Sequence, residues 1–233
     1  MSKYRDLYNI LAPNYDLRQQ NPSTFLLRKK ELSFIKKYSN GLVLDLGCGT
    51  GYHLDFPENV IGLDISEKQL FIAKSKNKPL IQGNIEQLPI KARSIDVVLC
   101  FYSTLNFVDL EKASKEISRI LRNGGVVITS PTSIQDICKK ELTENKNIKK
   151  FRLEGHRVNM RLFSKTEIIN CFEKIGFKLI KFDSIFRNQK PRWGNFKETS
   201  FFEKLKLKLD FLSPKEKGRI YFFVFEKTAS TTT

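Results

Sequence analysis

Three closely spaced glycines follow an apolar segment, and their spacing is suited to binding a ligand through the backbone. The segment LVLDL (42–46) runs into Gly47, Gly49 and Gly51, and Asp64 ends the next apolar run, 13 residues after Gly51. Glycine lets a chain turn sharply and approach a ligand closely, and a carboxylate ending a second strand can accept hydrogen bonds from both hydroxyls of a ribose. The pattern therefore indicates a nucleoside-binding site.

The spacing of the glycines argues against a dinucleotide cofactor. The dinucleotide-binding pattern G-x-G-x-x-G would require its third glycine at position 52, where this chain has Tyr52. We therefore do not expect NAD to be the ligand of this turn.

Strands and helices alternate around these residues. Short apolar runs, expected to be buried strands, occupy 42–46, 59–64, 78–83, 94–101 and 124–130, and helical patterns occupy 66–76 and 109–122. This alternation predicts a parallel sheet with helices on both faces. Helices at 4–11 and 22–38 precede the sheet, and a Ser-capped helix at 164–174 with strands at 178–186 and 219–226 completes it.

Two long segments do not fit the alternation. They are 134–161 and 187–218, and the second contains the amphipathic stretch FFEKLKLKLDFL. Loops of this length usually cover a binding site. We therefore expect both segments to lie over a substrate.

The order of these motifs resembles that of the class I S-adenosylmethionine-dependent methyltransferases. Asp45 with the G-x-G-x-G turn is similar to the family's first motif, and GLDIS (62–66) looks like its ribose-binding strand end. The stretches 81–100 and 116–129 look like the adenine-contacting region and the strands after it. The resemblance covers about 15–129, more loosely 163–180, and YNILAPNYD (8–16) is similar to the branch that includes ubiquinone and menaquinone biosynthesis enzymes.

The resemblance implies a Rossmann-like, doubly wound α/β fold. Its mostly parallel seven-stranded sheet would have helices on both faces and an antiparallel last strand. We expect residues 1–233 to form one methyltransferase domain. Within it, 1–40 would place helices over the cofactor site, 41–130 would bind the cofactor, and 131–162 and 187–218 would cover the substrate.

S-adenosylmethionine is the cofactor that the resemblance implies. Its methionine part would border the glycine turn, and its ribose would bind Asp64. Its adenine would pack on Ile65, and residues 84 and 85 would contact the edge of the base. Many relatives carry Asp where this chain has Asn84, whose amide can also donate. The full set of expected contacts is Asp45, Gly47, Cys48, Gly49, Asp64, Ile65, Asn84, Ile85 and Cys100. Taken alone, Asp64 could instead cap the helix beginning at Ser66.

Methyl transfer from a sulfonium needs little besides alignment of the acceptor for in-line displacement. A general base is required only when the acceptor is protonated at neutral pH. The candidates are Tyr15, Tyr102 and His156. Isolated histidines such as His53 and His156 are more often structural than catalytic, and core packing is the alternative role for the two tyrosines.

Composition limits the class of protein further. The chain is 40% hydrophobic and 28% charged, which is typical of a globular protein, and no apolar run approaches the roughly 20 residues that cross a bilayer. The N-terminus MSKYRDLYNI lacks an export signal, so we expect a cytoplasmic protein. Cysteines at 48, 100, 138 and 171 have neither metal-ligand nor disulfide-framework spacing, and no metal is expected.

The net charge of +16 is unevenly distributed. Residues 1–135 have a net charge of +5 and residues 136–233 one of +11. Such asymmetry attracts polyanions, although a lysine-rich surface can also be merely solvated. We expect a small-molecule acceptor; the alternatives are an RNA (tRNA) methyltransferase and a non-catalytic cofactor-binding scaffold that partners another chain. The RNA alternative depends on Phe151, Arg152, Arg157, Arg161, Arg192 and Trp193.

Overall fold

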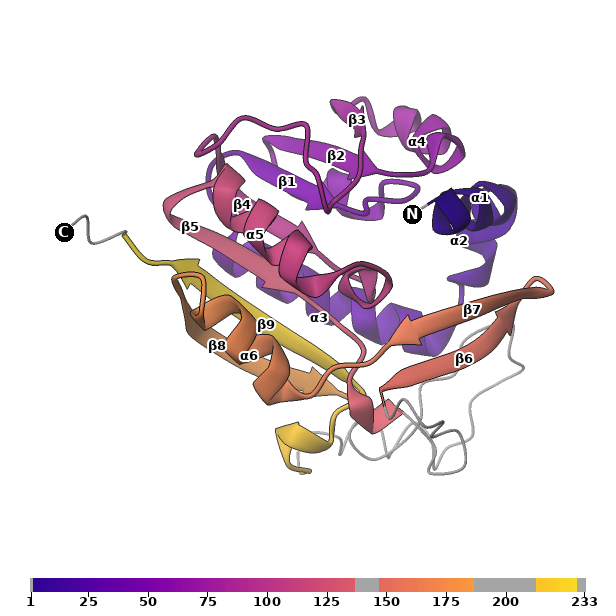
Figure 1. Ribbon diagram of the computed structural model, residues 1–233. Helices are drawn as coiled ribbons and strands as arrows, with labels where there is room; N and C mark the ends of the chain where they lie inside the picture. The colour runs from indigo at the N-terminus through magenta and orange to yellow at the C-terminus, as the bar shows by residue number, and fades with distance from the viewer. Residues whose placement is uncertain (1, 137–146, 187–212, 230–233) are drawn as a thin grey trace.

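A seven-stranded sheet forms the centre of the computed structural model, which describes residues 2–136, 147–186 and 213–229 (Figure 1). The strand order is β3-β2-β1-β4-β5-β9-β8. β1 to β5 pair in parallel, and β9 is antiparallel to both β5 and β8. The predicted mostly parallel sheet with an antiparallel last strand is thus confirmed. The strands are β1 (Val43–Leu46), β2 (Val60–Asp64), β3 (Leu80–Gln82), β4 (Ile95–Cys100), β5 (Leu121–Thr129), β8 (Phe177–Ile185) and β9 (Ile220–Lys227).

Helices cover both faces of this sheet, as predicted. α3 (Pro22–Tyr38) and α4 (Glu67–Ala73) pack on one face, and α5 (Leu110–Ile120) and α6 (Lys165–Glu173) pack on the other. In Figure 1, α5 and α6 lie in front of the sheet and α3 lies behind it. Each helix begins at a side-chain cap, because Asn21, Ser66, Asp109 and Ser164 accept hydrogen bonds from the first free amides.

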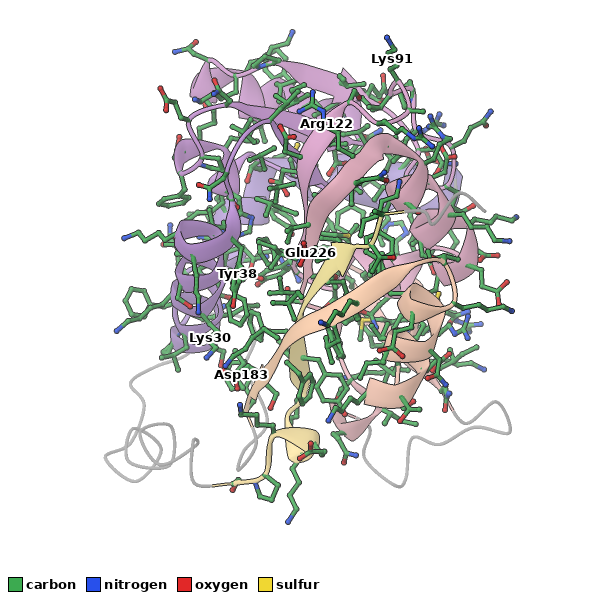
Figure 2. All side chains as sticks on the ribbon, turned by 90° about the vertical axis from the view of Figure 1, so that its left-hand side faces the viewer. Lys30, Tyr38, Lys91, Arg122, Asp183 and Glu226 are labelled. Carbon is green, nitrogen blue, oxygen red and sulfur yellow. The ribbon has the colours of Figure 1, made fainter. Side chains whose placement is uncertain are left out.

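The alternation of side chains along β1 divides the core between the two faces. Leu44 and Leu46 belong to the core under α5 and α6, whereas Val43 belongs to the core under α3. Asp45 alternates with the leucines and therefore faces α3. An ion pair also holds α3 to the far end of the sheet, since Lys30 Nζ lies 2.5 Å from Asp183 Oδ2 of β8 (Figure 2).

The N-terminal segment forms α1 (Ser2–Leu11), which ends before Pro13 as predicted, and α2 (Tyr15–Arg18). α1 lies beside a hairpin of β6 (Ile148–Leu153) and β7 (His156–Arg161) (Figure 1). Leu7 and Leu11 pack with Val158, and the Tyr4 hydroxyl donates to the Asn159 carbonyl at 2.7 Å. α1 and the hairpin thus form one cover over the carboxyl ends of the strands.

The hairpin corrects the expectation that 134–161 is an irregular cover. Glu154 and Gly155 have φ of 47° and 77°, as a two-residue hairpin turn requires. The described part also contains the short 3-10 helices η1 (Ala12–Asn14), η2 (Tyr52–Asp55), η3 (Lys74–Lys76), η4 (Thr104–Phe107), η5 (Ile134–Asp136) and η8 (Lys215–Lys217). Within the described ranges, no helix has the length and apolar character needed to cross a membrane. The amphipathic stretch FFEKLKLKLDFL, which we expect to be helical, and Cys138 lie outside the described residues.

Candidate functional site

The glycine turn joins β1 to η2 at the carboxyl edge of the sheet. Gly47, Gly49 and Gly51 have φ of 73°, 56° and 88°, in the left-handed region that residues with a Cβ rarely adopt. The Gly47 amide donates to the Leu63 carbonyl at 2.7 Å, and the Gly49 amide donates to Asp64 Oδ2 at 2.9 Å. β2 and its terminal carboxylate therefore fix the shape of the turn.

Asp64 connects the glycine turn to α4. Its Oδ2 accepts from the Gly49 amide, and its Oδ1 accepts from the Ser66 amide at 2.8 Å. Burial raises the pKa of Asp64 despite these hydrogen bonds, which favour the charged form. The cap of α4 is Ser66, whose Oγ accepts from the Gln69 amide at 3.1 Å. The alternative capping role of Asp64 thus belongs to Ser66.

A cavity, called here the first cavity, lies beside the turn. It is located where the strand order reverses between β1 and β4, the position at which open α/β sheets bind ligands. Its walls come from the glycine turn, the ends of β2 and β3, α1, α2, α4 and η4. The lining residues are Tyr4, Tyr8, Tyr15, Gly47, Gly49, Asp64, Ile65, Gln69, Gly83, Ile85, Tyr102, Thr104, Phe107 and Val108.

This cavity brings together part of the site expected from the sequence. Five of the expected cofactor contacts line it, as do Tyr15 and Tyr102 among the candidate bases. Asp45, Cys48, Asn84 and Cys100 are not in its lining. The lining residues that were expected as cofactor contacts are Gly47, Gly49, Asp64, Ile65 and Ile85.

The expected contacts outside the lining have other positions in the fold. The thiols of Cys48 and Cys100 are buried in the two cores, one on each face of the sheet. The side-chain oxygen of Asn84 accepts from the Glu86 amide at 2.9 Å and so stabilises the turn after β3. His156, at the start of β7, is exposed and lines neither this cavity nor the second one described below.

Beneath the turn, Asp45, Glu31 and His53 form a buried charged cluster. His53 Nε2 lies 3.0 Å from Glu31 Oε2, and His53 Nδ1 lies 4.0 Å from Asp45 Oδ2. Burial raises the pKa of Asp45 to about 6, although the charge of His53 opposes this. Burial lowers the pKa of His53, but the hydrogen bond and charge of Glu31 outweigh it and the net shift is upward. His53 is thus a partner of two carboxylates.

The two candidate tyrosines are held as neutral phenols. Burial raises the pKa of Tyr102 to about 12 and that of Tyr15 well above its usual value. The Tyr102 hydroxyl donates to Gln19 and is hydrogen-bonded to Thr24 Oγ1 at 3.1 Å. Because both phenols are protonated at neutral pH, they are suited to donating hydrogen bonds and unsuited to removing a proton.

Several residues that line the first cavity were not predicted from the sequence. For one of them, Gln69, the sequence contains a pattern that could have indicated its position. It stands three residues after Ser66, as in a capping box. Its Nε2 is 3.4 Å from the Tyr8 carbonyl, and its buried Oε1 has no hydrogen-bond partner within the described residues. Glu31 also had a signal, because it shares the apolar face of α3 with Leu27 and Phe34 at helical spacing.

Comparisons with known proteins agree with this geometry. Residues 44–129 match a family model described as a methyltransferase domain. An uncharacterized protein of Methanocaldococcus jannaschii is 31% identical over 194 residues, which cover 76% of each chain. The demethylmenaquinone methyltransferase of Lactococcus lactis is 34% identical over 152 residues, 56% of this chain and 59% of that protein.

A solved structure supports the fold independently. It is a protein of Thermotoga maritima described as an S-adenosylmethionine-dependent methyltransferase and possible histamine N-methyltransferase. The TM-score is 0.68 at 22% identity, over 96% of this chain and 99% of that one, so the likeness bears on the fold alone. The family model and the Methanocaldococcus relative thus agree with the strand order of the sheet and with the glycine turn. This chain belongs to the class I S-adenosylmethionine-dependent methyltransferases.

Proposed function

We propose that this methyltransferase transfers a methyl group to a small molecule bound in a second cavity beside the first. The observation that carries the proposal is a common wall, since Tyr8, Tyr15, Tyr102 and Phe107 line both cavities. An acceptor in the second cavity would therefore lie next to a cofactor in the first. The second cavity is lined by Tyr8, Leu11, Tyr15, Arg18, Gln19, Leu27, Tyr102, Ser103, Phe107, Thr132, Lys149, Phe151, Arg152, Leu153, Met160 and Ile220.

The residues of the first cavity fit S-adenosylmethionine. The Asp64 carboxylate is available to the ribose hydroxyls, and Ile65 and Ile85 offer apolar surface to the adenine. Gln69 Oε1 is a buried acceptor in this lining without a hydrogen-bond partner in the described part of the chain, and Asp45 Oδ2 is a second such acceptor beneath the turn, outside the lining. These acceptors and the negative charge near the turn suit a ligand that carries ammonium and sulfonium groups.

The absence of a Cβ at Gly49 leaves room for this ligand. A Cβ built there would approach only Gln69 Oε1 at 3.6 Å and a Tyr15 ring carbon at 3.9 Å, both of which line the first cavity. The protein itself therefore does not fill this position. We infer that the methionine part of the cofactor passes over Gly49.

When bound, the cofactor supplies a methyl group already activated by the positive sulfur. The chain contributes alignment and exclusion of water, since the shared tyrosine and phenylalanine rings surround the path between the cavities. The neutral phenol of Tyr15 would orient an acceptor by donating a hydrogen bond, whereas the single hydroxyl hydrogen of Tyr102 is donated to Gln19. This environment favours an acceptor atom that is nucleophilic without a strong base, and it disfavours an alcohol.

An RNA acceptor is the second candidate, and the outer face of the hairpin favours it. Lys150, Arg152, Arg157 and Arg161 are all exposed on β6 and β7, and Arg152 lies directly opposite Arg157. Adjacent like charges on a sheet are destabilising unless an anion lies between them. Arg192 and Trp193, the other residues expected to contact RNA, lie outside the described residues.

The experiment that tests the proposal supplies methyl-labelled S-adenosylmethionine with either the small-molecule fraction or the RNA fraction of a cell extract. We expect the label to enter the small-molecule fraction. Label in RNA would favour the second candidate, and cofactor binding with no label in either fraction would favour a non-catalytic scaffold. Calorimetry with S-adenosylhomocysteine, and with NAD as the control, establishes whether the first cavity binds the cofactor at all.

A further inference from the structure

A strained backbone turn joins the end of β4 to the common wall of the two cavities. Tyr102 and Ser103 have φ of 55° and 64°, in the left-handed region that residues with a Cβ rarely adopt. Tyr102 lines both cavities, and Ser103 lines the second. Such a conformation persists only where the surrounding structure holds it. The contacts that hold this turn therefore decide where the common wall stands.

Ser130, the residue after β5, holds both residues of the turn. Its Oγ accepts from the Tyr102 amide at 3.0 Å, and its carbonyl accepts from the Ser103 amide at 3.2 Å. A serine hydroxyl has a single hydrogen, which must point away from an amide that donates to the same oxygen. Because Ser130 is fully buried, that hydrogen needs an acceptor within the protein.

Glu31 of α3 supplies this acceptor. The Ser130 hydroxyl donates to Glu31 Oε1 at 2.9 Å, which leaves a lone pair of Oγ for the Tyr102 amide. Glu31 itself is fully buried and lines neither cavity. Its carboxylate therefore acts on the common wall through Ser130.

The other oxygen of the same carboxylate holds His53. Glu31 Oε2 lies 3.0 Å from His53 Nε2, and the imidazole packs against the ring of Phe101, with the ring centroids 5.0 Å apart. Phe101 immediately precedes the strained turn, whereas His53 belongs to η2, which follows the glycine turn. One buried carboxylate thus connects the segment after the glycine turn to the segment that carries the common wall.

Packing of α3 alone does not account for a charged residue at this position. Glu31 lies on the buried face of its helix with Leu27 and Phe34, where an apolar side chain would also fit. Burying a carboxylate is costly unless its oxygens are hydrogen-bonded, and replacing a buried ion pair by apolar side chains is often neutral or stabilising. The pattern of contacts therefore indicates a role in positioning.

We propose that Glu31 is a positioning residue for methyl transfer, which holds the common wall through Ser130 and the segment after the glycine turn through His53. The inference rests on the proposed function, because the common wall is assigned there to placing the acceptor beside the cofactor. Glu31 touches neither ligand. Its loss frees the Tyr102-Ser103 turn, and the fraction of molecules with a wall that fits the cofactor falls.

The first measurement is amide hydrogen exchange of the ligand-free protein, followed by NMR at single residues. Glu31→Ala and Ser130→Ala are each expected to speed exchange at the Tyr102 amide about tenfold or more, relative to the Val127 amide within β5. Glu31→Gln is expected to keep exchange near that of the wild type. Its side-chain oxygen can accept from Ser130, and its NH2 group can donate to a neutral His53.

The second measurement is calorimetry with S-adenosylhomocysteine. Glu31→Ala is expected to weaken binding about tenfold, and Glu31→Gln to restore most of the affinity. The initial rate of label transfer from saturating S-adenosylmethionine should fall in the same order of variants. The matched control is Lys30→Ala, which removes the neighbouring ion pair of α3 with Asp183. It is expected to change neither the exchange at Tyr102 nor the affinity.

The other outcomes are also decisive. Equal losses in Lys30→Ala and Glu31→Ala would mean that the attachment of α3, and not the carboxylate, holds the site, which overturns the proposal. Wild-type exchange at Tyr102 in Glu31→Ala overturns it too, as does a Glu31→Gln protein that binds no better than Glu31→Ala. If Glu31→Ala does not fold, Ser130→Ala decides, and unchanged exchange at Tyr102 in that variant contradicts the proposal.

Failure of the proposed function has a different signature. Label that enters only RNA, together with the expected exchange rates and affinities, would contradict the small-molecule acceptor and support the positioning role of Glu31.

Discussion

At the scale of single residues, Asp64 both accepts from two backbone amides and offers charge to a ribose. Asp64→Asn keeps an acceptor oxygen for only one of the Gly49 and Ser66 amides, places an NH2 group against the other, and removes the charge offered to a ribose. We expect Asp64→Asn to weaken S-adenosylhomocysteine binding about tenfold or more, since a hydrogen bond to a charged group contributes about 1.5 to 3 kcal/mol. Asp64→Ala is expected also to lower the free energy of unfolding of the ligand-free protein by about 1 to 3 kcal/mol.

The control for Asp64 is the true cap of α4. Ser66→Ala is expected to lower stability by about 1 kcal/mol. Affinity for S-adenosylhomocysteine is expected to fall less than in Asp64→Asn, because Ser66 is not in the cavity lining and acts on the cavity only indirectly, through its hydrogen bond to Asn9 of α1. If calorimetry finds Asp64→Asn within about twofold of the wild type, Asp64 does not hold the ribose.

Asp45 makes the ligand-free protein sensitive to pH. Its pKa of about 6 in the fold lies above the value of about 3.9 in an unfolded chain. Between these values the folded state binds more protons, so the free energy of unfolding falls as the pH rises from about 4 to 6. Asp45→Asn cannot titrate, so its free energy of unfolding does not fall in this way as the pH rises. The melting temperature of Asp45→Asn minus that of the wild type is therefore expected to be larger near pH 7 than near pH 4.

The His53 titration has to be kept apart from that of Asp45. The raised pKa of His53 gives stability that is present below about pH 6.5 and is lost as the pH rises through its folded pKa. Scanning calorimetry between about pH 4 and 6 therefore excludes most of the His53 titration, and the difference between Asp45→Asn and the wild type separates Asp45 from Asp64, whose pKa is also raised by burial. An Asp45→Asn protein less stable than the wild type throughout that window contradicts the interpretation.

At the scale of elements, α1 depends on a few polar contacts to stay over the first cavity. The Ser66 hydroxyl donates to Asn9 Oδ1 at 2.6 Å, and Asn9 Nδ2 donates to Glu67 at 2.8 Å. Asn9→Ala should release α1 from α4, with faster amide hydrogen exchange in α1 and weaker retention of the cofactor product. Arg5→Ala, which removes only an exposed pair with Asp6, is the matched control. Unchanged exchange in α1 would show that packing alone holds the helix.

The elements that the sequence predicted are those with a strong apolar pattern. β1, β2 and β4 are short apolar runs buried on both faces, and their order fixes the position of the glycine turn. The hairpin was missed because basic residues interrupt the alternation of Phe151 and Leu153 on β6, so its apolar row is weak. The Glu154-Gly155 turn between the strands was the signal that could have indicated it.

The candidate site was predictable where it depends on local sequence and not where it depends on distant contacts. Gly49 and Asp64 stand at spacings set by one strand-turn-strand unit. The aromatic wall comes from α1, α2 and the segment after β4, which only the complete fold brings together. Cys48 and Cys100 lie close to the turn and to the end of β4, but their side chains point into the cores.

At the scale of the whole molecule, cofactor binding should raise stability by mass action. At a free S-adenosylhomocysteine concentration about 100 times Kd, the free energy of unfolding rises by about 2.7 kcal/mol. For a chain of this size that corresponds to a rise in Tm of roughly 5 to 11 °C. NAD at the same concentration is the control and is expected to leave Tm unchanged. A larger shift with NAD than with S-adenosylhomocysteine would contradict the assignment of the first cavity.

The common wall of the two cavities makes the ligands interdependent. The wall residues would contact a ligand in either cavity; they are Tyr8, Tyr15, Tyr102 and Phe107. A position of these rings that the cofactor favours therefore changes how well the acceptor fits in the second cavity. Such heterotropic coupling is reciprocal: the factor by which the cofactor changes acceptor affinity equals the factor by which the acceptor changes cofactor affinity. The demethylated cofactor and the methylated product share the same wall, so the departure of one alters how tightly the other is retained.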